Sequence, residues 1–218
     1  MKNESLIKAS TLLASVNLLS RNRKDPYGNL SANYIKVKDM GLLGRSSLID
    51  DQSSLAGIAL GRSNMAAAGC EVIAVCNLLK RYNGGAKAVE LPDLIEIFER
   101  NGAVLSGRFG VSPQAMADYL KDLGLKTNFT SDQSDFDVLA QYCPHMIVTV
   151  MNDGTNIFKQ IHTFYVARED TPDGGRYFRP YNAGIRDRFR SIEDLIRALP
   201  GGKAKGISMI GISGESRY

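Results

Sequence analysis

Tryptophan is absent from this chain, and histidine is nearly absent, with two residues in 218. Without tryptophan, the core has to be filled by phenylalanine, tyrosine, leucine and isoleucine side chains. Hydrophobic residues make up 44% of the chain and charged residues 23%, which is typical of a folded domain and excludes a disordered one. At this length we expect one domain of ordinary size, or one domain with an N-terminal extension.

Cysteine is also scarce, and its three residues lie at positions 70, 76 and 143. An odd number without regular spacing argues against a disulfide framework and leaves room for one reactive thiol. Cys70 and Cys76 lack the close Cys or His neighbours that a structural zinc site requires. We therefore expect no metal and no cofactor.

Long apolar runs are missing too, because no stretch of about 18 apolar residues occurs, so the sequence predicts no membrane span. Residues 6–19 lack a signal-peptide cleavage site and read as an amphipathic helix. The expected location is cytoplasmic as synthesised, and export by a signal-peptide-independent secretion system is left open. A net charge of +4 is low for a nucleic-acid-binding protein, so we expect no nucleic acid among the partners.

The apolar pattern predicts helices first and antiparallel strands after them, which is typical of an α+β domain. Helices are expected over residues 1–20, 70–82, 91–100, 112–123, 136–142 and 192–199, and strands over residues 146–151, 161–167, 176–180 and 206–212. The 70–82 helix is apolar on nearly all sides and should be buried. Residues 21–35 read as a loop, and residues 36–63 either wrap the domain or form a partner-binding arm. We expect an N-terminal extension over 1–60, for targeting or partner binding, and one domain over 61–218.

Cys70 is the candidate nucleophile because it follows a glycine and opens the buried helix. The positive end of a helix dipole favours the thiolate, which is the reactive form of cysteine. Glu71 has two readings: a first-turn acid that suits the dipole, or a groove residue whose charge raises the thiol pKa. Cys76 and Cys143 read as structural thiols.

Three polar residues complete a candidate site around Cys70. His162 lies among apolar residues on a predicted strand, where a histidine needs a partner or a role, and it is the candidate base. Asn182 follows the next strand and can hold the imidazole in the useful tautomer. Asn64, six positions before Cys70, carries an amide that can donate to an oxyanion. His145 precedes its strand and reads as a residue at the surface or at the beginning of that strand.

The order of Asn64, Gly69-Cys70, an apolar helix, His162 on a strand and Asn182 after the next strand resembles that of papain-like cysteine peptidases. The resemblance covers about residues 60 to 212. It is closest to the bacterial branch that includes the double-glycine leader peptidases of bacteriocin exporters.

The sequence departs from that family at three places. Glu71 stands where members usually have glycine, and Asn64 replaces a longer glutamine. Tyr181-Asn182 stands where members have Asp-Pro or a similar pair.

The resemblance implies a papain-like fold, in which the helix opened by Cys70 packs on an antiparallel sheet that carries His162. It implies a cysteine peptidase that cleaves a peptide or protein through a Cys70 thiolate and an acyl-enzyme. Cleavage at a double glycine and a role as a secreted antibacterial or host-directed effector, with an immunity or inhibitor protein as partner, are open. The alternatives are a papain-fold transferase or deamidase, and a catalytically degenerate peptide-binding module.

Overall fold

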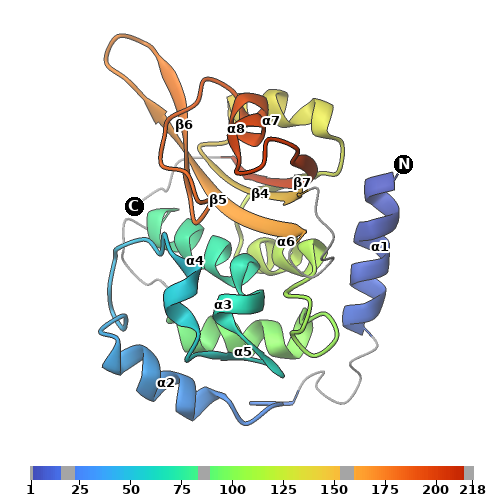
Figure 1. Cartoon of the computed structure of the whole chain (residues 1–218), viewed down its shortest axis with the longest axis vertical. Helices are drawn as coiled ribbons and strands as arrows, with labels where there is room; N and C mark the ends of the chain where they lie inside the picture. Colours follow the sequence, from blue (N-terminus) through green and yellow to red (C-terminus); the bar gives the residue numbers. More distant parts are fainter. Residues whose placement is uncertain (1, 16–22, 83–88, 153–159, 214–218) are drawn as a thin grey trace.

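A computed structural model of the chain shows an antiparallel sheet with helices on both of its faces (Figure 1). It describes residues 2–15, 23–82, 89–152 and 160–213. The helices are α1 (Lys2–Ser15), α2 (Leu30–Asp39), α3 (Met65–Ala68), α4 (Cys70–Tyr82), α5 (Leu91–Asn101), α6 (Pro113–Asp122), α7 (Phe136–Tyr142) and α8 (Ile192–Ala198). The predicted α+β class is confirmed.

All six predicted helices are present, although the predicted helix over 1–20 extends beyond α1 into residues outside the described part of the chain. The loop predicted over residues 21–35 is wrong in its second half, where α2 begins at Leu30. The Asn33 side chain explains this helix, because it accepts from the Ala59 N–H and donates to the Ala59 carbonyl. Tertiary contacts of this kind override weak local propensity.

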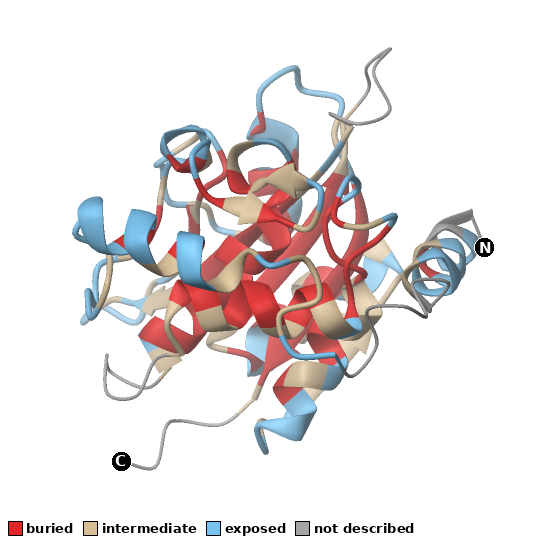
Figure 2. Cartoon of the chain, turned by 90° about the horizontal axis from the view of Figure 1, so that it is seen from below, coloured by how far each residue is buried: buried red, intermediate tan, exposed pale blue. Residues whose placement is uncertain are grey.

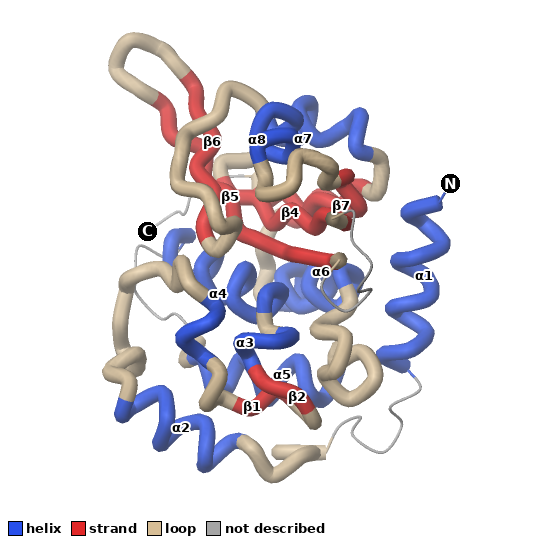
Figure 3. Tube along the Cα trace, in the orientation of Figure 1, coloured by secondary structure: helices blue, strands red, loops and turns tan. Residues whose placement is uncertain are grey.

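The main sheet has the order β3-β7-β4-β5-β6, with neighbouring strands antiparallel. Its strands are β3 (Thr127–Thr130), β4 (His145–Met151), β5 (Ile161–Asp170), β6 (Arg176–Tyr181) and β7 (Lys205–Ile212). The four predicted strands are confirmed, and β3 is an additional one. A two-stranded hairpin, β1 (Ala59–Leu60) and β2 (Ser63–Asn64), leads directly into α3 and α4 (Figure 3).

The two faces of the sheet bury separate hydrophobic clusters. Alternate residues of β5 show the division: Tyr165 and Ala167 pack into the cluster around α4, whereas Phe164 and Val166 pack into the cluster under α7 and α8. This is the period of two that a strand imposes on its side chains. Buried residues fill α4 and the middle of the sheet (Figure 2).

The segment before residue 60 packs into the same core as α4. Val37, Ile49, Leu55 and Ile58 are buried in that cluster. Asn77 of α4 accepts from the Ile49 N–H and donates to the Ile49 carbonyl. Residues 30–60 therefore wrap the helical layer, and the packing continues across the boundary predicted at residue 60.

Two arginines on the surface form ion pairs with acidic side chains. Arg186 pairs with Asp50 at 3.0 Å, and Arg188 pairs with Glu169 at 2.7 Å. Their charges are therefore partly neutralised on the surface.

Within the described ranges, every helix is too short or too polar to cross a membrane.

Candidate functional site

Cys70 occupies the first turn of α4, where the short helix α3 passes into α4 through a single residue. That residue is Gly69, and a Cβ there would lie 2.6 Å from both the carbonyl oxygen and the sulfur of Met65. Only glycine accommodates so close an approach. The Cys70 side chain is 6% exposed and lies against β5, whose Thr163 N–H interacts with the sulfur.

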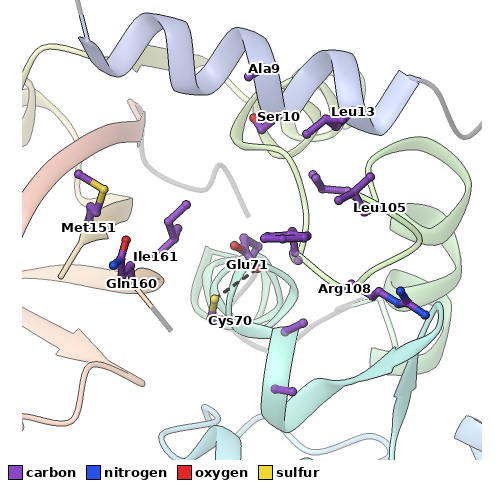
Figure 4. Close-up of a pocket in the computed structure, with 15 residues that line it drawn as sticks. Ala9, Ser10, Leu13, Cys70, Glu71, Leu105, Arg108, Met151, Gln160 and Ile161 are labelled. Carbon is purple, nitrogen blue, oxygen red and sulfur yellow. Dashed lines mark hydrogen bonds between the residues drawn. The ribbon is translucent and has the colours of Figure 1, made fainter. Parts of the chain in front are cut away.

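The Cys70 thiol donates to the Glu71 carboxyl, with 3.3 Å between Sγ and Oε2 (Figure 4). Burial raises the pKa of Cys70 well above its ordinary value, and the negative charge of Glu71 acts in the same direction. The Thr163 N–H opposes both effects, because it favours the thiolate. In this conformation burial and Glu71 both oppose the thiolate that the helix N-terminus is expected to favour.

Glu71 is buried beside the thiol, and its side chain points into the molecule instead of into solvent. Burial raises its pKa to about 7, although its own N–H and that of Val111 act in the opposite direction. The loop over residues 104–111 lies directly on this carboxyl. Gly110 makes that possible, because its φ is +70° and a Cβ there would collide with the carboxyl oxygens. Of the two readings of Glu71, the structure supports the groove residue that raises the thiol pKa.

His162 lies near the beginning of β5, and its ring is held by a main-chain carbonyl. The Nε2 atom donates to the Asn182 carbonyl oxygen at 2.5 Å. Because a carbonyl only accepts, the proton of the neutral ring is on Nε2, and Nδ1 carries the lone pair. Burial lowers the pKa of His162, while the bond to Asn182 acts in the opposite direction. Burial therefore favours the neutral form of the ring.

Asn182 is fixed from several sides directly after β6. Its φ of +62° is in the left-handed region, and its N–H donates to the Asp50 carboxylate at 2.9 Å. Its side chain accepts from the Gln52 N–H and donates to the Gln52 Oε1. The structure thus brings Asn182 to His162, but the contact runs through the carbonyl while the side-chain amide binds Gln52.

Asp50 and Gln52 are the site residues that sequence reasoning missed. They lie in the segment that had no assigned structure, about 130 residues before the asparagine that they hold. The apolar and polar pattern of a local segment does not predict a contact between residues so far apart in the chain. Gln52 also donates to the Ala66 carbonyl in α3, which connects the His162 side of the site to the helix before Cys70.

The sulfur of Cys70 meets the residue after His162, but the two side chains do not bond each other within the described part of the chain. Pairing between β5 and β6 begins at Tyr165, so the beginning of β5 has no β6 partner there. The sulfur meets β5 at Thr163, whereas the His162 ring lies 6.0 Å from the Phe164 ring, centroid to centroid. A pocket of about 280 Å³ contains Cys70, and another of about 420 Å³ contains His162.

The other candidates lie apart from this site. Asn64 is the N-cap of α3, and its side-chain oxygen accepts from the Ala67 N–H at 2.9 Å. Its side chain lines neither pocket and caps a helix through Oδ1, while the oxyanion role predicted for its amide N–H stays a prediction. His145 bonds the Tyr165 hydroxyl at 2.7 Å, and burial lowers its pKa to about 4.

Comparisons with protein-family models and with curated protein sequences found no match. Among the described residues, no group of three or more His, Cys, Asp or Glu side chains is arranged to hold a metal ion. The fold and the site define an α+β protein with a buried cysteine at a helix start and a tautomer-fixed histidine on the adjoining strand.

Proposed function

We propose that the chain is a papain-like cysteine peptidase that cleaves a peptide or protein substrate through Cys70 and an acyl-enzyme. One observation carries the proposal: β5 presents the Thr163 N–H to the Cys70 sulfur, and the adjacent residue is a histidine whose Nε2–H is held by the Asn182 carbonyl, which leaves the lone pair on Nδ1. A nucleophile beside a base that is oriented by a third group is the arrangement used in covalent catalysis.

The reaction begins with transfer of the thiol proton to Nδ1 of His162, which leaves a thiolate and an imidazolium. The thiolate attacks the substrate carbonyl carbon, and an S–C bond forms while the oxyanion faces N–H groups at the start of α4. The C–N bond then breaks, and the imidazolium protonates the leaving amine. Water, deprotonated by the same imidazole, hydrolyses the thioester and restores the thiol.

Binding of substrate has to precede proton transfer, because the resting thiol bonds Glu71 and not His162. Proton transfer also requires Sγ to leave Glu71 and to meet the imidazole at the free end of β5, because His162 alternates with Thr163 along the strand and its ring lies beside Phe164. Catalytic hydrogen bonds commonly form only in the substrate complex, so the open geometry is compatible with the proposal.

Within this proposal, the same cysteine and histidine serve a transferase if an amine replaces water as the acceptor of the acyl group. They serve a deamidase if the substrate is a glutamine side chain instead of a peptide bond. Cleavage at a double glycine, delivery as an antibacterial or host-directed effector and a dedicated inhibitor protein are further parts of the hypothesis. The second candidate is a peptide-binding module without catalysis. The Cys70–Glu71 bond favours it, because a thiol held by a carboxylate is a poor nucleophile.

Alkylation of Cys70 by an electrophilic peptide, followed by mass spectrometry, separates the two candidates. For a peptidase we expect selective modification of Cys70, with Cys76 and Cys143 unmodified. His162→Ala should slow the reaction at least about 100-fold, which is the usual contribution of a general base. The matched control is His145→Ala, which removes the other histidine and should leave the rate nearly unchanged. Equal labelling with and without His162 would refute the peptidase and leave the binding module.

A further inference from the structure

The pocket beside Cys70 combines apolar walls with one buried acid. Its volume is about 280 Å³, and α1 forms one side of it through Ala9, Ser10 and Leu13 (Figure 4). Leu105, Phe109 and Ile161 line it as well, and each of these large apolar side chains is more than a third exposed. The carboxyl of Glu71 and the thiol of Cys70 lie at its base.

Glu71 differs from the other buried acids of the helical layer in its surroundings. Glu96 pairs with Arg100 at 2.9 Å, and Glu99 accepts from the Asn29 side chain and the Gly61 N–H. Glu71, like Glu99, has no ion pair with any described residue, but its side chain lines a pocket. Buried carboxylates are normally paired with a cation or neutralised.

The pocket itself supplies only one cationic group from the described residues that line it. This group is Arg108, whose side chain is exposed and makes no ion pair with Glu71. Backbone donors and the thiol leave lone pairs on the carboxylate, because its two oxygens together accept about four hydrogen bonds. The Glu71 and Val111 N–H groups and the thiol use three of these positions, which leaves one for a ligand cation.

We propose that this pocket binds a protonated primary amine on an unbranched aliphatic stem, with the stem along Leu105 and Ile161 and the ammonium on Glu71. This inference rests on the proposed function, since it assigns a substrate group to the pocket beside the nucleophile. Two sources share this chemistry: a lysine side chain of the cleaved peptide, and a free amine that accepts the acyl group. In both cases the cation neutralises the charge that keeps Cys70 protonated, so binding and activation of the thiol are coupled.

The test compares two peptide chloromethyl ketones that differ only in charge. One carries lysine and the other its neutral analogue norleucine, at the first or the second residue before the reactive group. The ratio of their alkylation rates at Cys70 isolates the contribution of the ammonium, because any general change in thiol reactivity cancels. We expect lysine to react about tenfold faster in the wild-type protein, which corresponds to about 1.4 kcal/mol.

Three variants test whether the preference for the lysine probe over the norleucine probe arises in this pocket. Glu71→Gln should bring the ratio close to one, whereas Arg108→Ala should increase it by removing a like charge from the rim. Glu193→Gln, on the exposed surface of α8, should leave it unchanged. Thermal unfolding of each variant verifies that it is folded.

A second arm identifies the source of the amine. Cadaverine should accelerate the alkylation of Cys70 by iodoacetamide in the wild-type protein and not in Glu71→Gln. Acceleration without a lysine preference indicates a free amine, and a lysine preference indicates the substrate side chain. Absence of both effects in a protein whose alkylation still depends on His162 overturns this inference and leaves the peptidase intact. Loss of the His162 dependence refutes the proposed function itself.

Discussion

The burial of Glu71 predicts how the stability of this protein depends on pH. Burial raises the pKa of this carboxyl from 4.5 to about 7, and the side chain is only 5% exposed. The unfolded chain ionises Glu71 near its ordinary pKa, while the folded protein still keeps the proton. The folded state therefore loses stability as the pH rises from about 4.5 to about 7, and no more is lost above that range.

The magnitude follows from the pKa difference between the two states. Each pH unit over which the unfolded chain is ionised and the folded protein is not costs about 1.4 kcal/mol, so the whole interval costs about 3 kcal/mol. Glu71→Gln keeps the size of the side chain and cannot ionise. The difference in unfolding free energy, wild type minus variant, should therefore fall by about 3 kcal/mol between pH 4 and pH 8.

Urea unfolding of both proteins at several pH values between 4 and 8 measures this difference directly. Other titrating groups are common to both proteins and largely cancel in the subtraction. Asn64→Ala is the control. Neither asparagine nor alanine titrates, so the wild-type minus variant difference in unfolding free energy should be the same at each pH. A wild-type minus Glu71→Gln difference that does not vary with pH would show that Glu71 is solvated. A rise with pH would show a carboxylate stabilised by a cation.

The other predictions concern the thiol, the cap and the loop. Because the pKa of Cys70 is raised, its alkylation by iodoacetamide should still accelerate above pH 9, and Glu71→Gln should move that rise to lower pH. Asn64→Ala should cost about 1 kcal/mol of stability, as loss of an N-cap does, without changing the alkylation rate. Gly110→Ala should lower the melting temperature more than Gly28→Ala. Both glycines have positive φ, but only the first would place a Cβ against Glu71. Equal effects of the two glycine variants would contradict the packing of this loop.

The order and type of most elements could be predicted from the sequence because their apolar periods are strong. The helix that begins at Cys70 and the strand at Met146 have such patterns, and both are present. The position of β7 in the sheet could not be predicted. This last strand lies between β3 and β4, and its place depends on packing between distant segments. Leu30–Asp39 was missed because its helix depends on the contact between Asn33 and Ala59.

The candidate site was predictable only as far as side-chain chemistry and chain order determine it. Cys70, His162 and Asn182 could be selected because each is a reactive or polar residue at the end of a strongly patterned element. Their hydrogen bonds could not be predicted. The Asn182 carbonyl, and not its amide, holds the imidazole, since Asp50 and Gln52 fix the left-handed turn after β6. Asn64 was assigned by its spacing to Cys70, but the same spacing places it at the N-cap of α3.

Burial and the charge of Glu71 both oppose ionisation of the Cys70 thiol, and together they outweigh the helix N-terminus. A helix dipole typically contributes about 0.3–1 kcal/mol, up to about 2 when partly buried. A carboxylate in hydrogen-bond contact with the thiol, in a buried pocket, acts over a shorter distance and with a full charge. The charge of Glu71 adds to burial in keeping the resting thiol protonated, and a ligand cation can neutralise that charge. In a peptidase of the proposed kind, the thiol therefore reacts slowly with small electrophiles and faster when a cation fills the pocket, which is the behaviour that the lysine and norleucine probes measure.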